Sequence, residues 1–262
     1  MKTAKWLGFV LASLFSVCLD AKTVKIAVAA NFSHPIRSLI VEFEKTSDFQ
    51  IAPSFGSSGK FYAQIKQGAP YEIFFSADQA TPDALQKEGL VIKTSRFTYA
   101  IGRLALWSPK PQLLNNVESI LKLGRFNKLA VANPKLAPYG AATLEVLEHL
   151  ALVDRTRAKW VTGENIAQTY QFVATGNADL GFVALSQLLR VNKPKHVEQG
   201  SYWLIPDDMH QAIRQDVVLL RSAENSKGAK AFLDFMHTPK AQNIIQSYGY
   251  LDLNNDKSEL RL

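Results

Sequence analysis

Two spacings of apolar residues alternate along the first part of the chain. Short continuous apolar runs, typical of buried strands, occur at residues 24–30, 49–55 and 71–77. After the first run, apolar residues repeat at i, i+3, i+4 and i+7, which predicts one buried face of a helix: Ile36, Leu39, Ile40 and Phe43. A second helix is expected after Gly59, and Thr81 is placed to cap a third. This order of elements predicts a parallel sheet covered by helices.

The same alternation resumes after an apolar stretch at residues 97–107. Further strands are predicted at 129–132, 180–185 and 216–220, and further helices at 141–152 and 164–175. We therefore expect an α/β fold of two Rossmann-like lobes with mostly parallel sheets. Two crossings, near 97–107 and 206–216, would form the hinge, and a ligand cleft would lie between the lobes. Lobe I would contain residues 22–102 and 214–262, and lobe II residues 103–213.

Composition supports an ordered globular chain of one or two domains. The chain has 262 residues, of which 47% are hydrophobic and 20% charged, enough to bury a sizeable core and too apolar for disorder. Lys and Arg outnumber Asp and Glu by 30 to 23, but they are scattered, with no run of five. The charge therefore gives little support for nucleic-acid binding and is compatible with attraction of a small anion.

The first 21 residues have the pattern of a secretory signal peptide. Lys2 and Lys5 precede a twelve-residue apolar run at 6–17, and Ala21 offers a cleavage point. The run is shorter than the roughly 20 residues that a membrane-spanning helix needs. Cleavage after Ala21 would also remove Cys18, the single cysteine, and would exclude disulfides and thiolate sites. The alternative is a lipoprotein with lipid on Cys18, but Val17 stands where such signals have Gly, Ala or Ser.

Four predicted turns from strand to helix could carry chemistry. They are residues 29–32 and 56–59 in lobe I, and 137–140 and 163–166 in lobe II. Each presents backbone N–H groups at the start of a helix, next to small residues that let a ligand approach the backbone. Such helix starts favour an anion. Together the turns predict an anion site between the lobes, whereas each residue taken singly is better explained as an ordinary helix cap.

The side chains in these turns restrict the kind of anion. Asn31, Ser58 and Tyr139 offer neutral hydrogen-bond donors, and three of the four turns contain no acidic residue. A protonated anion such as hydrogen phosphate requires an acceptor, whereas a fully ionised tetrahedral oxyanion is repelled by a carboxylate. Glu164 is the exception, and we expect it in the first turn of its helix, pointing to water.

Catalytic motifs are absent from the sequence. The segment 56–59 is neither a nucleophile elbow nor a phosphate loop, and the five histidines have no metal-ligand spacing. Asp207 and Asp208 follow Pro206 and are expected in a solvated turn. An exported hydrolase stays as an alternative, but Ser57 and Ser58 have no identifiable His or Asp partner.

Several segments resemble periplasmic molybdate-binding proteins, in the right order and over essentially the whole mature chain. The segments are KIAVAANF (25–32), PSFGSSG (53–59), GAPYEIFFSAD (68–78), LAVANP (129–134), APYG (137–140), DLGFV (179–183) and QSYGY (246–250). The resemblance implies a type II periplasmic binding protein that closes on molybdate or tungstate and delivers it to the membrane permease of an ABC importer. It implies a monomer without catalysis, cofactor or nucleic-acid partner, in which molybdenum is bound only as the oxyanion.

The resemblance also implies the ligand contacts, at Asn31 and Ser58 in lobe I and at Tyr139 and Ile166 in lobe II. Ile166 would contribute its backbone N–H. The better-known branch of the family has Ser in place of Asn31 and a Tyr in place of Ala184, which has no side-chain donor. Tyr139 stands where that branch has a small residue and could replace the missing contact, as in another branch that shares both Asn31 and this Tyr. These changes leave the choice of oxyanion open, with sulfate or another tetrahedral oxyanion as the alternative; iron would require Tyr pairs and carboxylates.

Overall fold

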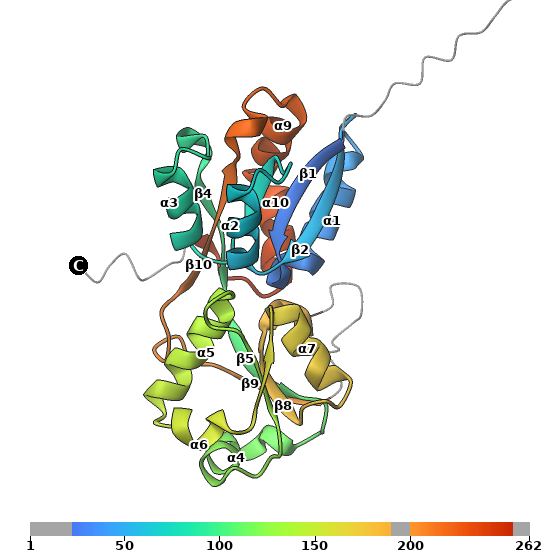
Figure 1. The fold of residues 1–262 in the computed structure, drawn as a ribbon. Coiled ribbons are helices and arrows are strands. Elements are labelled where there is room, and N and C mark those ends of the chain that lie inside the picture. Colours follow the sequence, from blue (N-terminus) through green and yellow to red (C-terminus); the bar gives the residue numbers. More distant parts are fainter. Residues whose placement is uncertain (1–22, 190–199, 254–262) are drawn as a thin grey trace, which may run out of the picture.

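The computed structural model describes residues 23–189 and 200–253, which form two α/β lobes, one above the other in Figure 1. The sheet of lobe I has the strand order β2-β1-β3-β10-β4. Its strands are β1 (Thr23–Ala29), β2 (Gln50–Gly56), β3 (Ile73–Phe75), β4 (Phe97–Gly102) and β10 (Ile213–Leu219). Strand β1 pairs in parallel with β2 and β3, and β10 runs antiparallel to β3 and β4. Four of the five strands therefore share one direction, so the expected parallel sheet has one reversed strand.

Helices cover both faces of this sheet. They are α1 (Ser33–Glu44), α2 (Ser58–Lys66), α3 (Ala80–Lys87), α9 (Lys227–Met236) and α10 (Pro239–Ser247). The apolar face predicted for the first helix is confirmed, because Ile36 and Leu39 are fully buried against the sheet together with residues of α9 and α10. On the other face, Phe61 of α2 and Leu85 of α3 pack against β1, β3 and β10. The prediction that Thr81 caps α3 is wrong. Instead, the carboxylate of Asp78 accepts from the Thr81 N–H in the first turn of α3, at 2.8 Å.

Lobe II repeats the arrangement of lobe I with a different sequence. Its strand order is β7-β6-β8-β5-β9, and its strands are β5 (Leu104–Ser108), β6 (Leu129–Ala132), β7 (Trp160–Gly163), β8 (Leu180–Ala184) and β9 (Ser201–Leu204). Its helices are α4 (Val117–Leu123), α5 (Pro138–His149), α6 (Val153–Arg157), α7 (Ile166–Ala174) and α8 (Leu185–Leu188). Here the reversed strand is β5, antiparallel to β8 and β9. The edge strand β7 was not predicted, since its four residues have no clear alternation.

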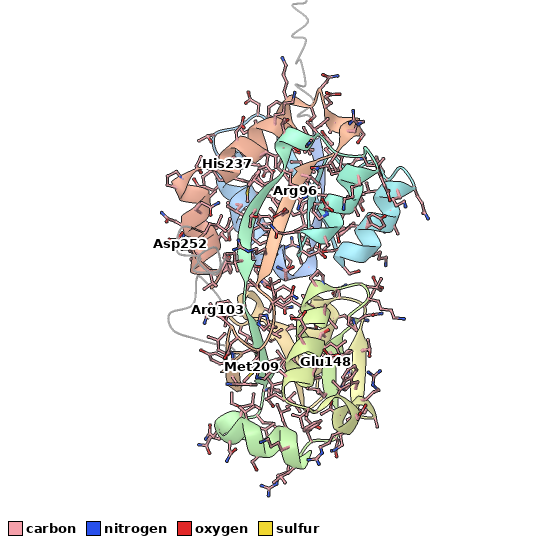
Figure 2. The ribbon with its side chains drawn as sticks, turned by 90° about the vertical axis from the view of Figure 1, so that its left-hand side faces the viewer. Arg96, Arg103, Glu148, Met209, His237 and Asp252 are labelled. Atoms are coloured by element: carbon pink, nitrogen blue, oxygen red, sulfur yellow. The ribbon has the colours of Figure 1, made fainter. Side chains whose placement is uncertain are left out.

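The chain passes between the two sheets twice. The first passage is immediate, because β4 ends at Gly102 and β5 begins at Leu104, so the long apolar stretch of the sequence is two strands in different sheets. Arg103 lies at this junction, between Arg96 in lobe I and Glu148 in lobe II (Figure 2). The second passage is the segment 205–212, which links β9 to β10. In each lobe the reversed strand is the one that enters from the other lobe.

No helix in the described part of the chain is both long and apolar enough to cross a bilayer.

Candidate functional site

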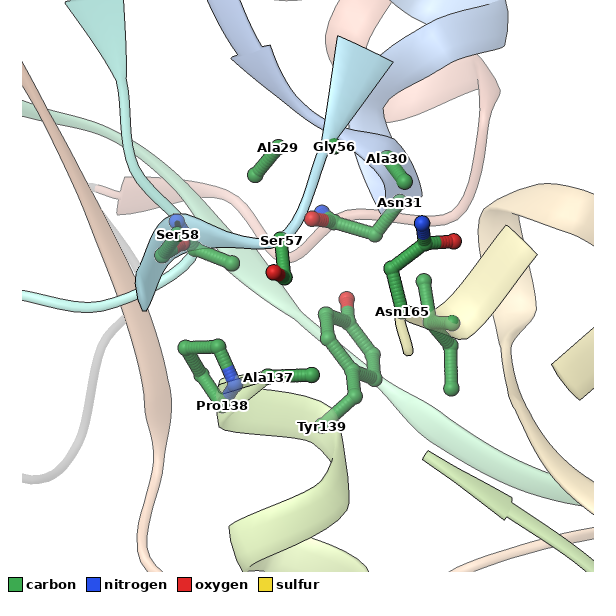
Figure 3. A pocket seen from close by; sticks show the side chains of 12 residues that line it. Ala29, Ala30, Asn31, Gly56, Ser57, Ser58, Ala137, Pro138, Tyr139 and Asn165 are labelled. Atoms are coloured by element: carbon green, nitrogen blue, oxygen red, sulfur yellow. Dashed lines mark hydrogen bonds between the residues drawn. The ribbon is translucent and has the colours of Figure 1, made fainter. Parts of the chain in front are cut away.

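The four residues singled out from the sequence meet in one pocket between the lobes (Figure 3). Asn31 lies in the short helix η1 (Ala30–Phe32), and Ser58 is the first residue of α2. Tyr139 is the second residue of α5, and Ile166 is the first of α7. The other lining residues are Ala29, Ala30, Gly56, Ser57, Ala77, Ala137, Pro138 and Asn165.

Strand register explains why these turns converge. In lobe I, the last residues of β1 and β2, Ala29 and Gly56, are directly paired in the parallel ladder. In lobe II, Ala132 at the end of β6 is paired with Gly163 at the end of β7. Because parallel strands end at the same edge of a sheet, the helices that follow also begin there. The two edges face each other across the pocket.

Backbone donors at these helix starts have no acceptor within their own helices. The first-turn N–H groups of Ser58, Tyr139 and Ile166 make no hydrogen bond to another described element. Asn165 caps α7, because its side-chain oxygen accepts from the N–H groups of Ala167 and Gln168, each at 3.0 Å. This cap leaves the Ile166 N–H available at the pocket. The positive ends of three helices therefore meet at the pocket, which favours an anion there.

The two serines of the 56–59 turn have different roles. The interpretation of Ser58 as a helix cap is wrong, because its hydroxyl oxygen accepts from the Ala77 N–H at 2.9 Å. That bond uses a lone pair and leaves the hydroxyl proton free to be donated. Ser57 is the N-cap residue by position but makes no capping bond, and its Oγ is buried without a partner among the described residues. Sequence reasoning missed Ser57 as a pocket donor, and the doubled serine was the available signal.

Asn31 belongs to a buried network rather than to a cap. Its side-chain nitrogen donates to Gln215 Oε1 at 2.8 Å and to the Tyr250 hydroxyl at 3.0 Å. The backbone carbonyl oxygen of Asn31 accepts from Ser186 Oγ at 2.8 Å, a bond that joins lobe II to lobe I. The sequence analysis did not identify Gln215, which lies far away along the chain.

The pocket lining carries no charged side chain. Its one titratable group is the hydroxyl of Tyr139, which is 1% exposed; burial and the neighbouring Tyr250 hold its pKa well above the ordinary value. The phenol is thus neutral over the physiological range and acts as a donor. Asp78 follows Ala77 but directs its carboxylate to the start of α3.

Glu164 differs from its predicted position. It precedes α7 instead of lying in the first turn, and its carboxylate forms an ion pair with Lys60 of α2 at 2.9 Å, with both side chains about half exposed. A second contact between the lobes lies beside it, where the Gly59 N–H donates to the Leu136 carbonyl at 3.0 Å. These contacts hold the lobes together at the rim of the pocket.

The pocket is small. The space between its lining atoms is about 200 Å³, a figure that includes space open to solvent. A larger hollow of about 740 Å³, which also includes open solvent, adjoins it at Ala77 and Pro138.

The described part of the chain offers this pocket neither a metal site nor an activated nucleophile. No group of three or more His, Cys, Asp or Glu side chains there could hold a metal ion. Neither Ser57 nor Ser58 bonds to a histidine or a carboxylate in that part, so no activated nucleophile is formed. The chemistry that this pocket offers is hydrogen-bond donation to an anion.

Comparison with known proteins identifies the family. The sequence pattern of the family of bacterial extracellular solute-binding proteins matches residues 24–251. The molybdate-binding protein ModA of Azotobacter vinelandii is 46% identical over 91% of this chain and 94% of its own length, and that of Rhodobacter capsulatus is 42% identical over 92% and 94%. The solved structure of the Azotobacter vinelandii periplasmic molybdate-binding protein superposes with a TM-score of 0.83 at 39% identity, covering 87% of this chain and 99% of that one. The chain therefore belongs to the family of bacterial extracellular solute-binding proteins.

Proposed function

We propose that the protein captures molybdate, and tungstate as a second ligand, between its two lobes and delivers it to the membrane permease of an ABC importer. Two relatives above 40% identity over nine-tenths of the chain are named as molybdate-binding proteins, which supports this ligand. The family consists of solute-binding transport proteins, so the chain is a binding protein and not an enzyme. Molybdate is its transported ligand rather than a cofactor.

The observation that carries the proposal is a lining with hydrogen-bond donors and without carboxylates. Asn31 and Ser58 from lobe I, and Tyr139 and Ile166 from lobe II, are the proposed contacts to the oxyanion. Molybdenum would be reached only through its oxygens. A doubly charged anion that carries no proton meets hydroxyl and backbone N–H donors from both lobes here, whereas hydrogen phosphate finds no carboxylate to accept its proton.

Binding by both lobes explains how capture is signalled. An anion that contacts helix starts from both lobes stabilises the arrangement in which they lie together, and so shifts the open-to-closed equilibrium. Ala184 is buried at the end of β8 and does not line the pocket, whereas Tyr139 does. We infer that Tyr139 supplies the side-chain contact that Ala184 cannot make.

Thermal unfolding of the mature protein with molybdate, tungstate, sulfate and phosphate at equal concentrations tests the ligand. A ligand at 100 times its Kd adds about 2.7 kcal/mol of stability, which at this size raises the Tm by roughly 5 to 11 °C. We expect this rise with molybdate and tungstate alone. A rise with sulfate instead would support the alternative of a different tetrahedral oxyanion, and a rise with none of the four would overturn the proposed ligand class.

The proposal extends to location and organisation. The family is described as extracellular, and the similar Azotobacter vinelandii structure is that of a periplasmic protein, which supports a periplasmic location for this chain. The proposed signal peptide at 1–21 and the alternative lipid on Cys18 lie outside the described residues; mass spectrometry of the exported protein distinguishes them. We also propose a monomer, which light scattering tests, with lobe I formed by 22–102 and 214–262 and lobe II by 103–213.

A further inference from the structure

Gln215 lies behind the pocket, where its side chain joins residues of both lobes. It is the third residue of β10, directly after the second passage between the lobes, and it is fully buried. It does not line the pocket. Its Oε1 accepts from Asn31 Nδ2 at 2.8 Å and is 2.9 Å from the Tyr99 hydroxyl, and its Nε2 donates to the Tyr139 hydroxyl at 3.3 Å.

These contacts orient the Gln215 amide. The Tyr250 hydroxyl donates to the Asn31 backbone carbonyl at 3.0 Å, so its oxygen accepts from Asn31 Nδ2. Because Asn31 Nδ2 can only donate, the atom of Gln215 that faces it must be the carbonyl oxygen Oε1. The Tyr99 hydroxyl lies between this oxygen and the Ser76 carbonyl, at 2.9 and 3.0 Å, and has one proton for the two acceptors. Nε2 is then left facing Tyr139, and it can only donate. The Tyr139 oxygen accepts this bond, so its own proton cannot be given to Gln215.

The same bonds divide the donor roles between Asn31 and Tyr139. The two N–H bonds of the Asn31 amide are used by Gln215 and Tyr250, so its side chain has no proton left for a ligand. The Tyr139 hydroxyl keeps its proton, and a charged anion oxygen is the strongest acceptor within its reach. The neighbouring Tyr250 hydroxyl is a weaker, neutral acceptor that already receives a bond from Asn31.

We propose that Gln215 is a positioning residue, which makes the Tyr139 hydroxyl the side-chain donor to the bound oxyanion and restricts Asn31 to its backbone N–H. The inference rests on the proposed function, because it concerns how that pocket presents its donors. The proposal excludes the reverse arrangement, in which the side-chain amides of Gln215 and Asn31 are each rotated by 180° so that nitrogen and oxygen exchange places. There Tyr139 would donate to Gln215 and the Asn31 amide would face the ligand.

A double-mutant cycle on Gln215 and Tyr139 tests this role, with Kd for molybdate measured by isothermal titration calorimetry. Tyr139→Phe removes the donated bond and should weaken binding about 10- to 150-fold, as expected for a hydrogen bond to a charged group. Gln215→Met should also weaken binding, at least about 5-fold, when Tyr139 is present. In the Tyr139→Phe background it should change Kd less than about 2-fold, because the group it positions is gone.

Thr98→Val is the matched control. Thr98 lies on the neighbouring strand β4. Its hydroxyl donates to Asp216 at 2.7 Å and accepts from Gln79 at 3.2 Å, so Thr98→Val removes two hydrogen bonds near Gln215 that Gln215 does not share. Its Kd should equal that of the unmodified protein. Should Gln215→Met not fold, Tyr99→Phe removes the hydroxyl that lies against Gln215 Oε1, and its smaller effect on Kd should likewise vanish with Tyr139→Phe.

Two results would overturn the inference. Equal weakening by Gln215→Met in both backgrounds would show a general structural role. An unchanged Kd in Tyr139→Phe would show that this hydroxyl gives no proton to the ligand, as in the reverse arrangement. If the unmodified protein binds sulfate instead of molybdate, the proposed ligand fails, and the same cycle measured with sulfate still decides the role of Gln215.

Discussion

Replacing Ser57 by alanine should make the protein without ligand more stable. The Ser57 hydroxyl is buried without a hydrogen-bond partner in the described structure, and the residue makes no side-chain cap to α2. A buried hydroxyl without a partner costs about 1 to 3 kcal/mol. Removing it should recover this energy and raise the Tm by roughly 2 to 12 °C.

Ser58→Ala should have the opposite effect on stability. Its oxygen accepts from the Ala77 N–H, and Ala77 is only 2% exposed. Leaving that N–H unsatisfied costs about 1 to 3 kcal/mol. Both variants should bind molybdate about 10 to 150 times more weakly, because each loses a hydroxyl donor to a charged ligand.

Differential scanning calorimetry without ligand, followed by calorimetric titration with molybdate, measures both effects. Ser222→Ala is the control, since Ser222 is exposed and far from the pocket lining; its stability should change by no more than about 0.5 kcal/mol. A lower Tm for Ser57→Ala would refute the argument from the unpaired hydroxyl. An unchanged Tm for Ser58→Ala would refute the role given to the Ala77 bond.

Three further predictions concern the rim, the junction and pH. Lys60→Met should raise the Kd for molybdate less than about 5-fold, because the ion pair of Lys60 with Glu164 is half exposed to solvent. The difference in Kd should vanish in 1 M NaCl, which screens the pair; a difference that persists in high salt would contradict the role given to the ion pair. Gly102→Ala places a Cβ in overlap with the Tyr139 hydroxyl and 2.6 Å from Gln215 Nε2, so binding should fall at least about 10-fold in titrations, and an unchanged Kd would contradict the packing. Burial raises the pKa of the Tyr99, Tyr139 and Tyr250 hydroxyls above the ordinary value of 10. The stability that their neutral forms provide is therefore complete below about pH 10, and the free energy of unfolding should fall above it by up to about 4 kcal/mol per pH unit, as measured by urea unfolding. If replacing these tyrosines with Phe leaves that slope unchanged, their raised pKa values are not its cause.

The sequence predicted where the pocket lies better than it predicted how the pocket works. Turns such as 56–59 and 137–140 are local features, visible where an apolar run gives way to a helical spacing. The parallel order of the elements then places their ends at one edge. Short strands were less predictable, because the four residues of β7 depend on pairing with β6 rather than on their own pattern.

Side-chain roles depend on contacts that no local pattern contains. Gln215 meets Asn31 across 184 residues of sequence, and Tyr250 meets it across 219. Ser57 and Ser58 differ in role because only Ser58 accepts a hydrogen bond from Ala77, which lies in the loop after β3. Glu164 was expected to be solvated, and its ion pair with Lys60 forms only because the lobes lie against each other.

The reversed strand of lobe I has a consequence for how the chain folds. Strand β10 lies between β3 and β4, and its Val217 pairs with Phe75 of β3. All of lobe II lies between these two residues in the sequence. Lobe II is one continuous stretch that can close its sheet alone, whereas the sheet of lobe I stays divided until β10 has been synthesised. Such distant pairing is slow, because a long loop must be closed before any contact compensates for the lost entropy. Since β10 also carries Gln215, the hydrogen bonds behind the pocket cannot form before β10 has been inserted between β3 and β4.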